Sequence, residues 1–253
     1  MSARAPAKGR RLLAIGDVHG RADLLGRLLA HIRSAEEGAR VIFLGDLIDR
    51  GPDSRAALDI VAAHLRENSG SHLILGNHDW FLREFLLDRL CEDDCRRWVE
   101  RYGAAETFLF YRIAGPASDW AAARARILAG WPGHRDMLCA ARHVLVEAPF
   151  CFVHAGLRPH VPLALQSSAD LMWIKTEFLE YRGAFEHCVV HGHTPTASGL
   201  PEVHPNRIAL DTHAFKSGHL TAAVFDEGRL SHFLRTTVSD DGAIAVDLLA
   251  APA

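Results

Sequence analysis

The chain has 253 residues, of which 49% are hydrophobic, 23% charged and 8% aromatic, and this composition excludes intrinsic disorder as a description of the whole chain. Its 28 basic and 31 acidic residues give a net charge of −3, so no overall field attracts nucleic acid or anionic lipid. We therefore expect a folded protein that acts on a small or specific substrate and does not bind nucleic acid as a bulk polyanion.

Charged residues interrupt every apolar run, and no segment approaches the roughly 18 apolar residues of a membrane span. The basic residues 1–11 lead only into a short apolar run and so lack the apolar stretch of a signal peptide. The five cysteines are too scattered for a disulfide framework. The sequence therefore predicts a cytoplasmic protein with reduced thiols and no membrane partner, in which residues 1–11 form a disordered tail.

The first ninety residues alternate short apolar runs with amphipathic runs. This alternation predicts parallel strands joined by helices, with ligands bound where each strand turns into the next helix. The expected strands are 12–15, 41–44 and 72–75, and the expected helices are 23–33, 53–66 and 80–90.

Residues 91–142 differ from the rest and are expected to form a mostly helical insertion. β-type patterns return after it, with one short helix at 171–181 among them. The expected later strands are 144–146, 151–153, 188–190, 208–210, 220–225 and 230–234. These patterns predict an α/β fold of two packed mixed β-sheets flanked by helices, as one domain at 12–238 followed by a C-terminal tail at 239–253.

Polar side chains gather at the three expected turns from strand to helix. Asp17 and His19 lie two residues apart where the first strand ends, so in extended chain both could reach one ion. Taken alone, an aspartate at this place more often caps a helix or forms a turn.

The second turn carries Asp46, Asp49 and Arg50, and the third carries Asn77, His78 and Asp79. Two carboxylates beside an arginine favour a site for cations and phosphate, because the planar guanidinium matches phosphate oxygens. Three successive turns with ligand-type side chains are hard to explain by helix capping.

Two later histidines, His154 and His193, each follow an apolar β run and have a glycine nearby. Glycine allows backbone and ligand to approach closely. Together with the three turns, these histidines predict a dinuclear metal centre built from oxygen and imidazole ligands.

The motifs GDVHG, GDLIDRGP, GNHD, VHAG and GHT, in this order, resemble those of metallophosphoesterases of the phosphoprotein phosphatase type. That group includes bacterial serine/threonine phosphatases and symmetrical diadenosine tetraphosphatases. The resemblance covers about residues 12–221, apart from most of the 91–142 insertion. It implies a calcineurin-like αββα sandwich.

The resemblance also implies roles for individual residues. Asp17 and His19 would bind the first metal, Asn77, His154 and His193 the second, and Asp46 would bridge the two. His78 would be the general acid, held by Asp49. Arg50, Asn77 and Lys175 would bind the phosphate. Two metals lower the pKa of the water that they share, so that a bridging hydroxide attacks the phosphorus. The expected metals are two divalent ions, with Mn²⁺ named because the resembled bacterial phosphatases use it and with Fe, Zn, Co or Ni as alternatives.

Three positions depart from the family pattern. Asp79 replaces the usual glutamate. Lys175 stands where the family commonly has a second arginine clamp, so it would supply a point charge in place of a fork. His213 follows Asp211-Thr212 where the family has glycine, and we expect it at the surface. His191 is expected to face the same side as His193, and we rank it below His193 as a ligand.

The leading hypothesis is hydrolysis of phosphate monoesters, namely phosphoserine and phosphothreonine in proteins. The main alternative is a small phosphorylated substrate, diadenosine tetraphosphate, cleaved by the same centre. Aromatic residues of the insertion, such as Trp98 or Trp120, could then stack on a base. A third hypothesis, a catalytically silent phosphate- or metal-binding module, is disfavoured because every expected ligand is present together with His78 and Asp49.

Overall fold

The computed structural model describes residues 11–36, 38–115 and 119–252. The basic tail expected at 1–11 therefore lies outside the described residues, apart from Arg11. Charge pairs tie Arg11 to the folded chain through Glu36 and Asp226.

The described strands form two mixed sheets. A six-stranded sheet has the order β11-β10-β9-β1-β2-β3, and a five-stranded sheet has the order β4-β5-β6-β8-β7. The strands are β1 Leu12–Ile15, β2 Arg40–Phe43, β3 His72–Leu73, β4 Val144–Glu147, β5 Phe150–Val153, β6 Cys188–His191, β7 Glu202–His204, β8 Arg207–Ala209, β9 Thr221–Asp226, β10 Arg229–Val238 and β11 Ile244–Ala250. Strands β1, β2 and β3 run parallel, as do β5, β6 and β8. The expected pair of packed mixed sheets is confirmed.

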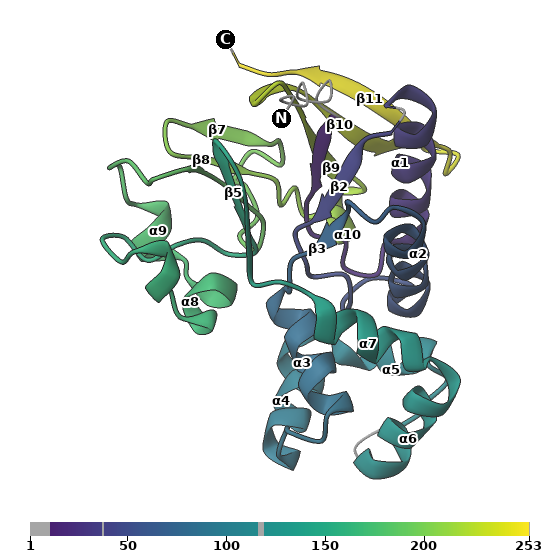
Figure 1. Cartoon of the computed structure of the whole chain (residues 1–253). Coiled ribbons are helices and arrows are strands. Elements are labelled where there is room, and N and C mark those ends of the chain that lie inside the picture. Colours follow the sequence, from purple (N-terminus) through teal and green to yellow (C-terminus); the bar gives the residue numbers. More distant parts are fainter. Residues whose placement is uncertain (1–10, 37, 116–118, 253) are drawn as a thin grey trace, which may run out of the picture.

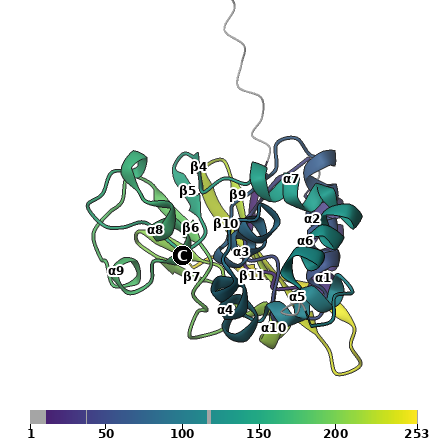
Figure 2. The same cartoon turned by 90° about the horizontal axis from the view of Figure 1, so that it is seen from below.

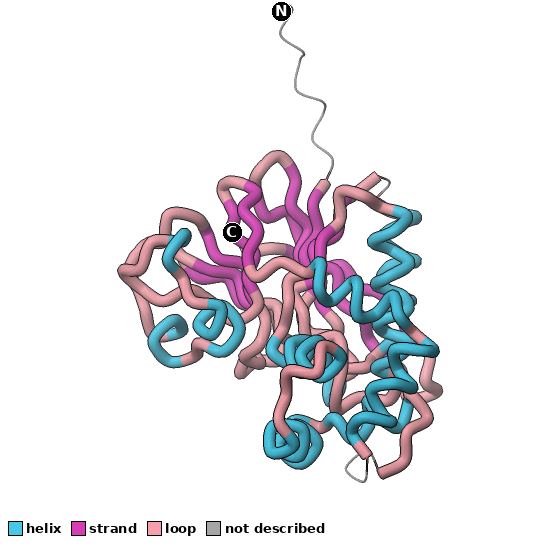
Figure 3. The backbone as a smooth tube through the Cα atoms, turned by 60° about the horizontal axis from the view of Figure 1, so that its bottom comes forward, coloured by secondary structure: helices cyan, strands magenta, loops and turns pink. Residues whose placement is uncertain are grey.

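Helices cover the outer faces of both sheets (Figures 1 and 3). They are α1 Ala22–Ala35, α2 Ser54–Glu67, α3 Asn77–Leu86, α4 Glu92–Tyr102, α5 Ala104–Phe110, α6 Trp120–Gly130, α7 Pro132–Ala140, α8 Ser168–Trp173, α9 Thr176–Leu179 and α10 Ala214–Ser217. Helices α1 and α2 lie on the first sheet, and α8 and α9 lie beside the second (Figure 1).

The alternation of side chains along the strands explains this layering. In β1, Ala14 points into the cluster between the sheets, whereas Leu13 and Ile15 point into the cluster under α1 and α2. In β5, Phe152 faces the other sheet and Val153 faces α8 and α9. Successive side chains of a strand point to opposite faces, and because both faces are covered by apolar elements, these strands are apolar throughout.

The insertion expected at 91–142 contains helices α4 to α7, which gather with α3 below the sheets in Figure 1; Figure 2 views them from that side. Phe85 from α3 contacts Trp98, Phe108 and Trp120 from three of the insertion helices. These four aromatic side chains make the insertion a packed extension of the main core.

Two strands were not expected from the sequence. Residues 239–253, predicted to be a tail, contain β11, which pairs with β10 over seven positions from His232↔Ala250 to Val238↔Ile244. Strand β7 pairs antiparallel with β8. Both lie at sheet edges, where only one neighbour and one packed face are available, so their side chains are less apolar than those of central strands.

Candidate metal centre

The predicted site residues meet at one edge of the two sheets because they follow strands that run parallel within each sheet. The amide nitrogens of Val18 and His19 donate to the carbonyl oxygen of Asp46 over 3.1 and 2.8 Å, which joins the loops after β1 and β2. In the second sheet, the amide of Gly192 donates to the carbonyl of His154 over 2.8 Å.

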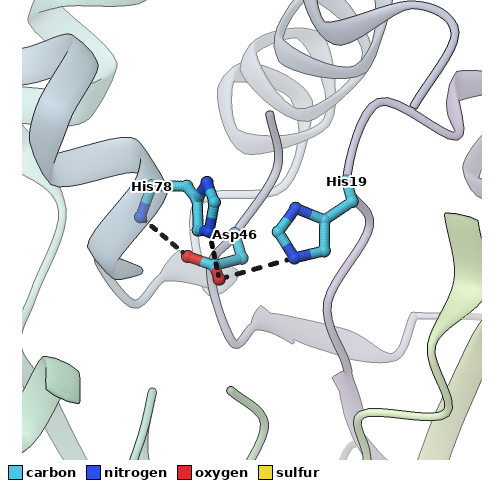
Figure 4. Close-up of side chains that lie close together, drawn as sticks. All are labelled: His19, Asp46 and His78. Atoms are coloured by element: carbon cyan, nitrogen blue, oxygen red, sulfur yellow. Dashed lines mark hydrogen bonds and ion pairs between the residues drawn. The ribbon is translucent and has the colours of Figure 1, made fainter. Parts of the chain in front are cut away.

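Asp46 stands at the middle of the site and takes part in two groups of potential ligands. In the first, His19 Nε2 and His78 Nε2 lie 3.6 and 3.9 Å from Asp46 Oδ2 (Figure 4). In the second, His154 Nε2 lies 3.3 Å from Asp46 Oδ1, with His193 close by. Within each group the ligand atoms are within 4.8 Å of one another. One carboxylate thus faces two places for a cation.

Asn77 and Asp17 complete the arrangement from the third and first turns. Asn77 Oδ1 lies 2.9 Å from both His154 Nε2 and His193 Nδ1. Both carboxylate oxygens of Asp17 accept the His193 amide at 3.1 Å. The structure therefore brings together all six residues predicted to bind metal.

The tautomers of the histidines fit metal binding. His19 Nδ1 and His154 Nδ1 each donate to a backbone carbonyl, that of Ile48 and Leu44, over 2.8 Å. A carbonyl only accepts, so Nδ1 carries the proton and Nε2 is directed into the site, the arrangement usual for metal-binding histidines. His193 Nε2 is buried and has no hydrogen-bond partner among the residues that the structure describes. Oxygen and imidazole donors of this kind fit first-row divalent cations.

The site concentrates negative charge away from water. Burial, reinforced by Asp211, raises the pKa of the Asp17 carboxyl well above its usual range. Burial opposes ionisation of Asp46 as well, but His154, His78 and His19 hold the pKa of that carboxyl well below its usual range. Burial also opposes charge on His154, yet Asp46 outweighs it and raises the pKa of His154 to about 10. A proton on His154 Nε2 lies beside the oxygens of Asp46 and Asn77. The same oxygens that favour this positive charge also favour a bound cation.

The backbone at the site adopts sparsely populated conformations. The φ angles of His19, Asp46, Asp49, Arg50 and His193 are all positive, between 42° and 71°. Non-glycine residues seldom adopt such angles, and strain of this kind gathers at functional sites.

Two glycines leave room for the carboxylates of Asp46 and Asp17. A Cβ atom at Gly76 would lie 2.2 Å from Asp46 Oδ1, and one at Gly192 would lie 2.0 Å from Asp17 Oδ1. Any larger residue would displace a predicted metal ligand.

His78 is held by a buried hydrogen-bond chain. Its Nδ1 lies 2.7 Å from Asp49 Oδ2, and Asp49 has no exposed surface. Trp98 Nε1 donates to the same oxygen over 2.7 Å, and Thr107 Oγ1 donates to Asp49 Oδ1 over 2.6 Å. Sequence reasoning did not place Trp98 or Thr107 beside Asp49, because both lie in the insertion, where no motif marks such a contact.

Arg50 links the two imidazoles of the first ligand group. Its Nη1 donates to His19 Nε2 over 2.9 Å and its Nη2 to His78 Nε2 over 2.8 Å, and the guanidinium lies 5.5 Å from the ring centroid of Phe215. This arginine is exposed, unlike the ligands around it. Its guanidinium is therefore accessible to an incoming phosphate.

Comparison of the sequence with known protein families identifies the family of this chain. The sequence profile of the calcineurin-like phosphoesterases matches residues 10–222. The chain belongs to the calcineurin-like phosphoesterase family. It is thus a phosphoric ester hydrolase, and the family implies divalent metal ions.

Two relatives of this calcineurin-like phosphoesterase are named for different activities. It is 27% identical to a symmetrical bis(5'-nucleosyl)-tetraphosphatase of Dechloromonas aromatica, over 85% of this chain and 92% of that one. It is also 27% identical to serine/threonine-protein phosphatase 1 of Salmonella typhimurium, over 85% and 91%. The solved cold-active protein-tyrosine phosphatase of a Shewanella species shares the fold, with a TM-score of 0.55, 18% identity and coverage of 94% and 80%. No helix in the described part of the phosphoesterase is long and apolar enough to cross a membrane.

Lys175, the predicted second phosphate clamp, is exposed just before α9. Burial is the main cause that lowers the pKa of His193 to about 2, and the charge of Lys175 contributes. Lys175 therefore lies near the metal centre. Arg158 lies four residues after His154, but it forms a two-pronged pair with Asp170 at 2.9 and 2.5 Å and so is not free to act as this clamp.

One expectation about flanking residues was wrong, and the structure answers two questions that the sequence left open. His191 does not face the side of His193: β6 ends at His191, and the positive φ of His193 turns the chain. Neither Trp98 nor Trp120 can stack on a base, because both are buried in the core of the insertion. His213 is only partly exposed and contacts Phe215, which in turn contacts His19.

Asp79, the acidic residue that departs from the family glutamate, holds loops together. Its carboxylate accepts from the amides of Leu47 and Gly76 over 2.9 and 3.2 Å, so it joins the second turn to the start of α3.

Proposed function

We propose that this phosphoesterase hydrolyses phosphate monoesters, with phosphoserine and phosphothreonine of proteins as substrates. The observation that carries the proposal is a single carboxylate, Asp46, shared by two ligand groups, with the His78–Asp49 pair beside it. His19 and Asp46 belong to the first group, and together with Asp17 from the same turn as His19 they support the binding of one cation; His78, the third member of that group, is the proposed general acid.

The second group supports binding of another cation through Asp46, Asn77, His154 and His193. When bound, two divalent ions lower the pKa of water and offset the charge on the phosphoryl oxygens. Mn²⁺ as the ion and a cytoplasmic location stay predictions.

Arg50 and His78 carry out the steps that belong to the chain itself. We infer that Arg50 moves its two N–H donors from the imidazoles of His19 and His78 to the phosphate oxygens, for which its fork is suited. That movement frees His78 Nε2 to face the leaving group. Once Arg50 has moved, His78 Nε2, which accepts a hydrogen bond in the structure, takes up a proton from solvent. As water adds to phosphorus and the ester P–O bond breaks, that proton passes to the leaving oxygen and the added water releases one proton to the solvent, while Asp49 keeps the His78 ring in orientation.

Hydrolysis of dinucleoside polyphosphates is the second candidate, supported by two aromatic side chains beside the centre. Tyr102 lies 5.8 Å from His78 and Trp173 lies 6.2 Å from His193, measured between ring centroids. The two rings are 5.7 Å apart and partly exposed. Aromatic side chains at such a place are suited to contact a base.

Competition assays distinguish the two substrates. Hydrolysis of an aryl phosphate should disappear after exhaustive chelation and return with Mn²⁺; full activity in the chelated protein would contradict the proposal. A phosphopeptide should then compete at lower concentration than diadenosine tetraphosphate. The reverse order, together with a Tyr102→Leu variant that raises KM only for the dinucleotide, would favour the second candidate.

A further inference from the structure

A cavity with several polar side chains in its lining lies on the outer face of the five-stranded sheet, and none of the predicted metal ligands lines it. It has a volume of about 180 Å³ and lies against α9. The register of the strands explains its lining: His204 pairs with Arg207, Ala209 pairs with Glu202, and His191 of β6 pairs with Ala209. Paired residues of neighbouring strands share a face, so these side chains point into the same space.

Four buried polar atoms of the residues that line this cavity have no hydrogen-bond partner among the described residues. They are Arg207 Nε, His191 Nε2, Thr194 Oγ1 and Thr196 Oγ1. Buried polar atoms are nearly always satisfied, so each such exception requires an explanation. Four around one small cavity point to a shared polar occupant.

Arg207 determines the charge of that occupant. Its side chain is only 5% exposed, it donates to Asn206 Oδ1 over 3.2 Å, and its guanidinium lies 5.9 Å from the ring centroid of Phe178. Among the described residues, no carboxylate lies within 4.0 Å of this guanidinium to form an ion pair. A buried cation without a counter-charge is costly, and an anion would remove the cost.

The one carboxylate that lines the cavity is occupied elsewhere. Glu202 accepts from His204 Nε2 over 3.1 Å, and its side chain is 34% exposed. It therefore lies towards the solvent and is paired, and its charge reaches Arg207 only from beyond ion-pair distance, so Arg207 Nε stays available to an anion.

We propose that this cavity binds a single phosphate ion. Its volume is below the roughly 300 Å³ at which pockets for nucleotide- or drug-sized ligands begin. It exceeds by several times the roughly 30 Å³ that one water occupies. A small oxyanion fits between these limits, with Arg207, Thr194 and Thr196 as donors.

His191 favours phosphate over sulfate. Its Nδ1 donates to the carbonyl of Gly192 over 3.0 Å, so Nε2 of the neutral ring is an acceptor. Hydrogen phosphate has a P–OH group that can donate to it, whereas sulfate at neutral pH carries no proton.

Phosphate binding to the metal-loaded protein, measured by equilibrium dialysis with labelled phosphate, tests the proposal. The wild type should bind two ions, one at the metal centre and one at the cavity. Arg50→Met should retain only the cavity ion. Arg207→Met should lose it, whereas the matched control Arg182→Met, an exposed neighbour that does not line the cavity, should keep both.

Two further measurements keep the test decisive. Thr196→Val removes one donor with little change of shape and should weaken the second phosphate about tenfold, the effect of one hydrogen bond to a charged group. Sulfate should compete at the cavity at least tenfold more weakly than phosphate. One phosphate in the wild type, lost with Arg50→Met, would show that water fills the cavity and would overturn the proposal.

Discussion

Trp98→Phe tests whether the insertion positions the proposed general acid. Trp98 is fully buried and donates from Nε1 to Asp49 Oδ2 over 2.7 Å, and the same oxygen lies 2.7 Å from His78 Nδ1. Phenylalanine keeps an aromatic ring but removes the donor. Asp49 would then keep Thr107 and His78 as side-chain partners in a place that water does not reach.

The size of the effect follows from the burial and the charge. A hydrogen bond to a charged group contributes about 1.5–3 kcal/mol. For a chain of this size each kcal/mol shifts Tm by about 2–4 °C, so the lost bond should lower Tm by about 3–12 °C. A less firmly held Asp49 also lets the His78 ring turn, and small misplacements of a catalytic group can cost about 10²-fold in rate.

Trp120→Phe is a matched control. Trp120 belongs to the same aromatic cluster and contacts Phe85 and Phe108, but its Nε1 has no hydrogen-bond partner in the described part of the chain. Both substitutions remove the same atoms, so the difference in Tm between the variants isolates the hydrogen bond to Asp49.

Kinetics separate positioning from stability. With Trp98→Phe, kcat for an alkyl phosphate should fall more than kcat for p-nitrophenyl phosphate, whose leaving group needs less protonation. Trp120→Phe should not change that ratio. If the two variants have the same Tm and the same ratio of kcat values, the reasoning is refuted and Trp98 acts only by packing.

The remaining predictions concern the metal centre itself. His78→Asn should lower kcat by about 10²–10⁴ for substrates with poor leaving groups and leave metal content, measured by elemental analysis, nearly unchanged; loss of metal would show that His78 is a ligand, as its 3.9 Å approach to Asp46 allows. Gly192→Ala should reduce metal content, because the new Cβ would meet Asp17 at 2.0 Å; undiminished metal content would remove Asp17 from the ligand set. Lys175→Ala should raise KM and Lys175→Arg should lower it, and two variants with wild-type steady-state kinetics would mark Lys175 as a residue that only solvent contacts.

The ligands of the metal centre could be predicted from sequence because their arrangement follows from local rules. Each lies at or just beyond the end of a strand, and parallel strands of one sheet end at one edge. Asp46, His154 and the others therefore meet once the apolar runs form sheets. The same apolar runs, buried on both faces, fixed the two-sheet architecture.

The C-terminal strand and the orientation of His191 could not be predicted in this way. Strand β11 lies at a sheet edge, so its weak apolar pattern resembles that of a tail. The argument that His191 and His193 face one side assumed extended chain, and the φ of 65° at His193 breaks the two-residue period.

The tertiary structure alone decided which residues support the reactive ones. Trp98 and Thr107 lie 49 and 58 residues from Asp49 along the chain, and only the packing of the insertion brings their donors to its carboxylate. Arg207 likewise became a candidate ligand only when folding buried it with no carboxylate of the described residues within ion-pair distance. Motifs reveal side chains that a strand end positions locally, whereas contacts across such distances depend on how whole elements pack.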